Sequence, residues 1–178
     1  MTLTLISTHT ASASATLDIT SGIDSTYDSY EFHCVNMHPA TNNTIFQFQV
    51  NASGLTGFNE VITSTFLRAY HGEGGAGGAL QYVTGSDQAQ GTAYQTIGYY
   101  TGNGNDESES GILTLYAPSS TTYVKHFVAR VQIYNDSDYS QDCHAAGYIN
   151  TTAAIDEISF KFQSGNIDAG TIKMFGVS

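Results

Sequence analysis

Short runs in which apolar and polar residues alternate recur along almost the whole chain. The clearest run spans residues 44–51 (TIFQFQVN), where Phe46, Phe48 and Val50 are separated by single, mostly polar residues. A period of two is typical of a half-buried β-strand, because successive side chains of a strand point to opposite faces. The pattern therefore predicts a strand whose three named side chains face the core.

A second alternating run spans residues 27–37 (YDSYEFHCVNM). Tyr30, Phe32 and Cys34 share one side of it, and continued alternation adds Asn36 to that side. We therefore expect a second half-buried strand with these four residues on its inner face. The residues that follow, 38–43, contain proline and asparagine and are typical of a turn.

The same pattern predicts nine further strands and no amphipathic helix of ten residues or more. These strands are expected at 16–19, 60–71, 80–84, 88–100, 112–117, 121–134, 145–151, 154–163 and 171–177. The alternation slips once within 154–163, which indicates a β-bulge. Loops are expected at 72–78, which is rich in glycine, and at the acidic segments 101–111 and 135–142.

This many short strands at even spacing favour an all-β fold, specifically an antiparallel two-sheet β-sandwich that is jelly-roll-like. We expect one such domain over residues 17–178. Residues 1–16 are small and polar after the first six, and are expected to form an extended N-terminal arm. That arm either lies across a neighbouring molecule or frays.

Charge restricts the classes of partner. The chain has five Lys and Arg residues against sixteen Asp and Glu, a formal net charge of −11. So few basic residues cannot neutralise a phosphate backbone, which argues against nucleic acid and anionic lipid as partners. No stretch is long and apolar enough to suggest membrane insertion. Other proteins, neutral or cationic glycans and divalent cations remain as partners.

Sequence signatures of catalysis do not occur. The chain has no H-E-x-x-H, C-x-x-C, G-x-S-x-G or phosphate-binding loop motif. Lys125 and His126 are adjacent, but neighbours in a strand point to opposite faces and cannot act together. We therefore predict no catalytic residues, no enzymatic activity and no cofactor. Cys34 and Cys143 are expected to be buried free thiols, with a disulfide as the alternative.

Calcium is the alternative to a metal-free protein. The weak candidates for Ca²⁺ ligands are Asp106 and Glu107 in one acidic segment and Asp136 and Asp138 in the other. Ca²⁺ requires six to eight oxygen ligands, and the spacing does not match an EF-hand. Both segments are better explained as solvated loops.

Tyrosine gives the stronger indication of binding. Tyr99, Tyr100, Tyr134 and Tyr139 lie in or beside predicted loops, and a tyrosine ring offers flat amphipathic area for protein or sugar contacts. The alternative for each ring is that it caps a strand end in the core. The predicted binding residues, all in loops, are Tyr99, Tyr100, Asn103, Asn105, Asp106, Tyr134 and Tyr139.

Several stretches together resemble one group of proteins. They are TSGIDSTYDSYEF at 20–32, NMHPAT at 36–41, TFLRAYH at 65–71, GNDESESGILTLYAPSSTTYVKHF at 104–127 and AGYINTTAAIDEISFKFQSGNIDAGTIKMFGV at 146–177. With the opening segment, this string resembles small virion structural proteins of tailed bacteriophages, especially those of marine bacteria and cyanobacteria. The resemblance extends over nearly the whole chain and carries no catalytic motif.

The resemblance implies a location in the virion, after assembly in the host cytoplasm. It implies a capsid-attached role as head decoration, knob or head-fibre component, acting through contacts with other virion proteins. It also suggests a homo-oligomer, for which we expect a trimer. The alternatives are a tail-fibre or tail-tip receptor-binding module that contacts host glycans, and a carbohydrate-binding module.

Overall fold

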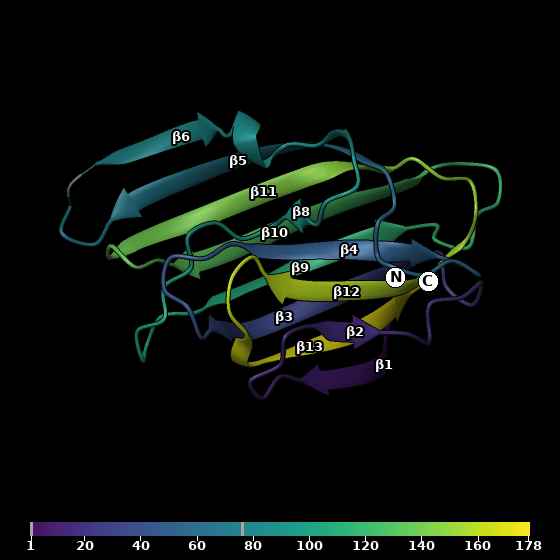
Figure 1. The fold of residues 1–178 in the computed structure, drawn as a ribbon, viewed down its shortest axis with the longest axis horizontal. Coiled ribbons are helices and arrows are strands. Elements are labelled where there is room, and N and C mark those ends of the chain that lie inside the picture. Colours follow the sequence, from purple (N-terminus) through teal and green to yellow (C-terminus); the bar gives the residue numbers. More distant parts are fainter. Residues whose placement is uncertain (1, 76) are drawn as a thin grey trace.

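The computed structural model describes residues 2–75 and 77–178. Nearly all of its regular structure is β-strand, arranged in two antiparallel sheets that pack face to face (Figure 1). The all-β sandwich predicted from the alternation is confirmed. Within the described residues no helix is long and apolar enough to cross a membrane.

The strands are β1 (Leu3–Thr10), β2 (Leu17–Ile19), β3 (Ser29–Pro39), β4 (Phe46–Ala52), β5 (Ile62–Gly72), β6 (Gly78–Tyr82), β7 (Ala89–Gly91), β8 (Gln95–Thr96), β9 (Glu109–Tyr116), β10 (Lys125–Tyr134), β11 (Tyr139–Ile149), β12 (Ile155–Phe162) and β13 (Ile167–Val177). A 3₁₀ turn, Thr84–Ser86, lies between β6 and β7.

The strand order is that of a jelly roll with an extension. The large sheet has the order β1-β13-β3-β9-β10-β11-β5-β6, with β7 also paired to β5, and the small sheet has the order β2-β12-β4-β8. The pairs β1–β13, β2–β12, β3–β9 and β4–β8 are nested in sequence, as in a long hairpin folded over into two layers. Strands β10, β11, β5 and β6 then widen the large sheet beyond the small one.

The short edge strand β8 and the irregular residues on either side of it lie over the part of the large sheet that β2, β12 and β4 do not reach (Figure 1). Their contacts with β5 are direct: Ser64 Oγ donates to Gln95 Oε1 at 2.6 Å, and the rings of Phe66 and Tyr99 lie 5.8 Å apart. Ile97 from the same segment is buried. A long, weakly structured connection thus completes the core.

Aromatic side chains fill the space between the sheets. Phe46, Phe48 and Val50 are fully buried, as the alternation predicted. The ring of Phe160 on β12 is central, with centroids 5.7 Å from Phe32 of the opposite sheet and 5.9 Å from Phe46 beside it. Such contacts combine a large buried apolar area with favourable ring geometry.

One inner-face prediction for 27–37 is wrong. Tyr30, Phe32 and Cys34 are buried as expected, but Asn36 is exposed, with a left-handed φ of 50°. The register of β3 shifts between Cys34 and Met37, and Met37 takes the buried position instead. This bulge cannot be recognised from alternation alone. The bulge predicted in 154–163 is confirmed by a register shift between Ile155 and Glu157.

Several strand bounds also differ from those predicted. The acidic loop expected at 135–142 is shorter, because β11 already begins at Tyr139. Gln141 and Cys143 are buried there, while Asp142 projects outward and pairs with Arg130, whose Nη2 lies 2.8 Å from Asp142 Oδ2. An acidic residue on the outer face of a strand gives the same sequence pattern as a loop residue, which explains the difference. The strand expected at 88–100 consists only of the short β7 and β8.

The segment predicted as an N-terminal arm lies along its own domain. Residues 3–10 form β1, the edge strand that pairs with β13, and Ser14 bridges to Ile167. Met1 lies outside the described residues, as does Ala76 in the glycine-rich segment 72–78. The two cysteines, Cys34 and Cys143, are buried free thiols. Burial is the main reason that the pKa of each thiol is raised.

Gly170 in β13 gives a test of the bulged pairing between β3 and β13. Its φ is +127°, and an added Cβ would lie 2.8 Å from the Asn36 carbonyl oxygen and 2.9 Å from Met37 Cα. We expect Gly170→Ala to lower the free energy of unfolding by about 1–3 kcal/mol through backbone strain and crowding. Chemical denaturation measures this change. Gly85→Ala, where no heavy atom lies within 4 Å of an added Cβ, is the control and should be close to neutral. Equal stability of the two variants would contradict the bulge.

Candidate functional site

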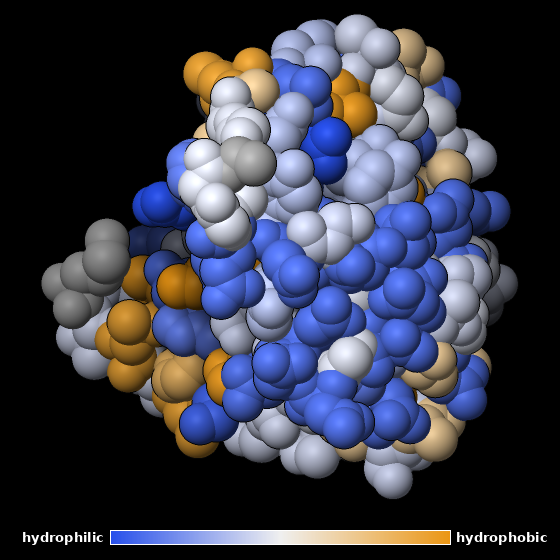
Figure 2. Space-filling model, turned by 90° about the vertical axis from the view of Figure 1, so that its left-hand side faces the viewer, coloured by the Kyte–Doolittle hydropathy of each residue, from blue (hydrophilic) through white to orange (hydrophobic). Residues whose placement is uncertain are grey.

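Loops gather at one end of the sandwich, on the left in Figure 1. They follow β3, β5, β8 and β10, and they include the segments 40–45, 73–75, 97–108 and 135–138. Viewed from that end, the surface is hydrophilic over its centre, with apolar patches toward its edge (Figure 2). The loop residues predicted to bind all lie in these segments or at the adjoining ends of β10 and β11.

A hollow of about 320 Å³ opens at this end, and we call it the tyrosine–arginine hollow. Strands β5 and β11 and the segment before β9 supply its larger side chains, and the loops around Asn43 and Asn135 supply its polar rim. The larger side chains are Arg68, Tyr70, Tyr100, Tyr139 and Gln141. The rim consists of Asn43, Asn135, Asp136 and Ser137.

Arg68 organises the hollow from within. Its guanidinium carbon lies 5.0 Å from the ring centroid of Tyr70, 4.7 Å from that of Tyr99 and 5.7 Å from that of Tyr100. These are cation–π distances, which are favourable in partly desolvated sites. Nη1 of Arg68 also donates to Gln141 Oε1 at 2.8 Å, and Nε and Nη2 donate to Gln81 Oε1 at 3.2 and 3.0 Å. The guanidinium is thereby fixed in place.

Tyr99 and Tyr100 form a pair at the edge of the hollow. Their ring centroids are 4.0 Å apart, and the Tyr99 hydroxyl donates to that of Tyr100 at 3.1 Å. Burial, followed by this hydrogen bond, raises the pKa of Tyr99 to about 12. Tyr100 is 36% exposed and has a left-handed φ of 61°. Bulky residues rarely adopt this conformation, and residues held in it concentrate at binding and catalytic sites.

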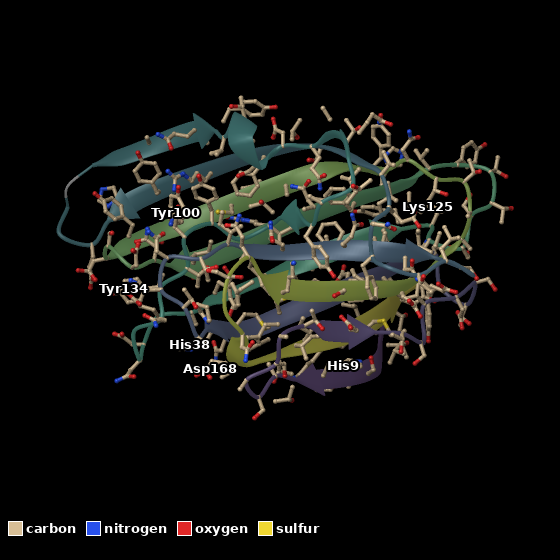
Figure 3. The ribbon with its side chains drawn as sticks, in the orientation of Figure 1. His9, His38, Tyr100, Lys125, Tyr134 and Asp168 are labelled. Atoms are coloured by element: carbon tan, nitrogen blue, oxygen red, sulfur yellow. The ribbon has the colours of Figure 1, made fainter. Side chains whose placement is uncertain are left out.

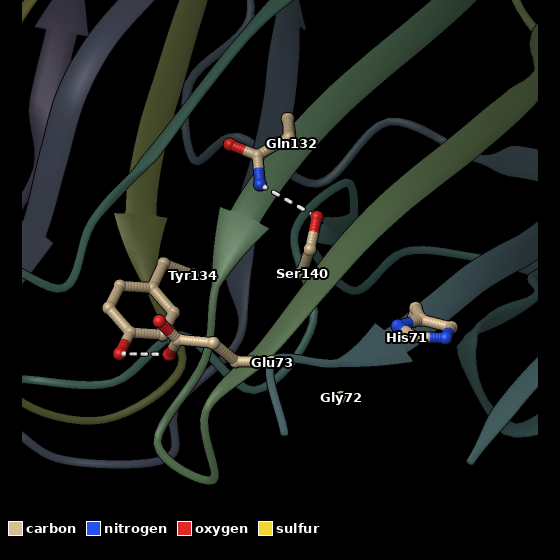
Figure 4. A pocket seen from close by; sticks show the side chains of 6 residues that line it. All are labelled: His71, Gly72, Glu73, Gln132, Tyr134 and Ser140. Carbon is tan, nitrogen blue, oxygen red and sulfur yellow. Dashed lines mark hydrogen bonds between the residues drawn. The ribbon is translucent and has the colours of Figure 1, made fainter. Parts of the chain in front are cut away.

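Tyr134 lies in a different place, on the outer face of the large sheet. It lines a hollow of about 370 Å³ with His71, Glu73 and Ser140 (Figure 4). Its hydroxyl is 3.1 Å from Asp138 Oδ1 and 3.2 Å from Glu73 Oε2, and the hydrogen bond to Asp138 raises the pKa of Tyr134 to about 12. Tyr100 and Tyr134 both lie toward the loop end of the sandwich (Figure 3). They line separate hollows.

The predicted residues of segment 101–111 form a third group. Asn103 is tied to the turn after β3, because its backbone N–H donates to Asn42 Oδ1 at 3.1 Å and its amide donates to the Ala40 carbonyl at 3.2 Å. Asn105 and Asp106 line a hollow of about 490 Å³ that also includes His38. His38 Nε2 donates a hydrogen bond to the Gly104 carbonyl oxygen at 3.1 Å and so anchors this loop.

The four calcium candidates are not brought together. Asp106 and Glu107 precede β9, whereas Asp136 and Asp138 lie between β10 and β11. The Glu107 carboxylate accepts a hydrogen bond from the backbone N–H of Gly104, and that of Asp138 lies beside Tyr134. Within residues 2–75 and 77–178, no three His, Cys, Asp or Glu side chains are grouped as metal ligands.

Sequence reasoning thus found part of the tyrosine–arginine hollow. Tyr100 and Tyr139 line it, and Tyr99 lies behind it against Arg68. Arg68, Tyr70 and Gln141 were missed. Arg68 and Tyr70 continue the inward alternation that begins at Ile62, so the period of two in 60–71 is a usable signal for both. No sequence pattern marks Gln141, because the acidic residues around it predict a loop.

Comparison with known proteins adds no relative. No protein-family description matches the sequence, and no curated protein is similar to it. The fold and the surface features of the described residues are therefore the structural observations that bear on function.

Proposed function

We propose that this chain is a non-enzymatic surface protein of a bacteriophage virion, attached to the capsid and acting through contacts with neighbouring proteins. The sequence resemblance suggests the setting. The observation that best supports a contact role is the outer face of the large sheet, because it carries exposed apolar side chains across its whole width.

Exposed apolar side chains are concentrated on this face. Of the twelve large hydrophobic residues exposed in the described part of the chain, nine project from it, as the strand register shows. These nine are Leu3, Leu5, Val35, Leu67, Leu80, Tyr82, Ile112, Tyr116 and Val128. Extended exposed apolar surface on a folded domain is typical of a protein interface.

The charges on this face largely compensate one another. Arg130 on β10 forms a two-point contact with Asp142 on β11, with Nε–Oδ1 and Nη2–Oδ2 distances of 3.0 and 2.8 Å. His144 Nε2 lies 3.2 Å from the same carboxylate. A nearly neutral face with apolar side chains suits docking onto another protein better than docking onto a charged polymer.

Introducing charge at the centre of this face tests the proposal. We expect Val128→Lys to abolish incorporation of the chain into phage particles, because a desolvated ammonium group cannot be accommodated in an apolar contact. Gel analysis of purified particles measures incorporation. Tyr123→Lys, at a loop position that is 72% exposed, is the matched control and should be incorporated normally. Normal incorporation of Val128→Lys would exclude this face as the contact.

The same gel separates the head from the tail. Hundreds of copies per particle would support capsid attachment, and about a dozen would support the tail-fibre or tail-tip alternative. Absence of the chain from particles would overturn the virion proposal itself. The expected trimer is checked by light scattering on the purified protein.

A further inference from the structure

We infer that the tyrosine–arginine hollow is a binding site for a neutral glycan, held by stacking of a sugar ring on Tyr100 and by hydrogen bonds to the rim. This goes beyond the proposed contact role. The inferred glycan site does not depend on the proposed contact role, because the hollow lies at the loop end of the sandwich and not on the apolar outer face.

The size and lining of the hollow suit a small hydroxyl-rich ligand. Its volume of about 320 Å³ is at the lower end of the range of small-molecule sites, roughly 300–1,000 Å³. An aromatic ring beside amides and a carboxylate is a suitable surface for a sugar, which presents apolar C–H groups on one face and hydroxyls around its edge. Asn43 and Asp136 offer donor and acceptor atoms at the rim.

Tyr100 is prepared for such stacking. Its ring is supported from behind by Tyr99 at 4.0 Å and by the Arg68 guanidinium at 5.7 Å. A second aromatic pair, Tyr70 and Tyr139 with centroids 5.7 Å apart, forms another wall. Because the rings are already fixed, little side-chain entropy is lost when a ligand binds. The left-handed backbone of Tyr100 is explained if the ring has to be held in this position.

The electrostatics favour a neutral ligand over an acidic one. Arg68 is the cation of the hollow, and three of its five N–H donors are already used by Gln81 and Gln141. Three tyrosine rings surround the remaining guanidinium surface, and Asp136 adds a carboxylate at the rim. With a net charge of −11, the whole chain also repels anionic sugars.

The test is a glycan array that carries both neutral and acidic oligosaccharides, probed with the purified full-length protein. We expect binding to neutral glycans. Tyr100→Ala should weaken that binding at least about tenfold, whereas Tyr100→Phe should retain most of it because the ring is kept. Asn43→Ala, at an exposed rim position, should weaken it less than Tyr100→Ala. Tyr123→Ala is the control outside the hollow and should bind as the wild type does.

Three results would overturn this inference. They are no binding to any neutral glycan, binding to acidic glycans alone, or binding that Tyr100→Ala leaves unchanged. Circular dichroism checks that each variant is folded. If Tyr100→Ala does not fold, the glycan binding of Tyr100→Phe and Asn43→Ala still tests the site. Because incorporation into particles is measured separately with Val128→Lys, failure of glycan binding can be distinguished from failure of the proposed virion role.

Discussion

Phe160→Ala is expected to remove about 3–5 kcal/mol from the free energy of unfolding. The Phe160 side chain is fully buried on β12 and contacts Phe32 of the large sheet and Phe46 and Phe48 of its own sheet, with centroid distances of 5.7, 5.9 and 6.5 Å. Truncation loses the transfer free energy of the ring and leaves a cavity that rigid strands on both sides cannot close. Domains of this size have a total stability of about 5–15 kcal/mol, so the loss is a large part of the whole.

Urea denaturation followed by circular dichroism measures this effect. Phe160→Leu keeps much of the volume, so it should lose distinctly less stability and provides a readout if the alanine variant does not fold. Tyr123→Ala, which removes an aromatic ring that is 72% exposed, should leave the denaturation midpoint nearly unchanged. A loss below about 1 kcal/mol for Phe160→Ala would mean that the two sheets do not meet at this ring.

Glu109→Gln is expected to change how stability depends on pH. The Glu109 carboxyl, on β9, is buried, and one of its oxygens accepts a hydrogen bond from Thr101 Oγ1 at 2.5 Å. The other oxygen, Oε1, has no hydrogen-bond partner among the described residues. Burial raises the pKa of Glu109 to about 8, and the hydrogen bond from Thr101 opposes this rise only in part. The folded protein therefore keeps Glu109 protonated at neutral pH.

The direction of the pH effect follows from which state holds the proton. Below about pH 4.5 the carboxyl is protonated in both the folded and the unfolded chain. As the pH rises from there to about 8, the unfolded chain releases the proton and the folded chain retains it. The contribution of Glu109 to stability therefore falls with rising pH, by about 1.4 kcal/mol per pH unit, and levels off above the folded pKa.

A glutamine at this position remains neutral in both states. We therefore expect Glu109→Gln to be similar in stability to the wild type near pH 5 and more stable than it by a few kcal/mol at pH 8. Denaturation midpoints across this range measure the difference. Asp106→Asn, at an exposed position, also replaces a carboxyl by an amide. Its denaturation midpoint should depend on pH more nearly as that of the wild type does than the midpoint of Glu109→Gln. Parallel curves for Glu109→Gln and the wild type would show that the buried carboxyl does not titrate as described.

The alternation of side chains predicts that two β-sheets pack face to face, but it does not predict which strands pair with one another. Phe46, Phe48 and Val50 face the core as expected, because the period of two is a local property of the strand. Gln49 was expected to point away from them, and it is nevertheless buried, since its amide donates to the carbonyls of Glu60, Thr92 and Ala93. Whether a segment covers the second face of a sheet depends on contacts that are distant in sequence.

The candidate site was only partly predictable for the same reason. Abundant tyrosine in predicted loops points to Tyr100 and Tyr139, and both line the hollow. Their proximity to Arg68 results from the pairing of β5 with β11 and from the position of the segment before β9. No local pattern encodes that proximity. The left-handed backbone at Tyr100 cannot be predicted from the sequence either, because such positions are normally marked by turn-forming residues such as glycine and asparagine.

The nested pairing of the strands has a consequence for how the chain reaches its folded state. β1 lies at one edge of the large sheet and pairs with β13, so residues 3–10 align with residues 171–177 across almost the entire length of the chain. During synthesis on a ribosome, the first strand emerges long before its partner exists. Such distant pairings also make folding slow, since a long loop must close before the contact is gained. The nascent chain therefore exposes unpaired apolar strands for an extended time, which makes chaperone binding or rapid assembly with neighbours valuable at this stage.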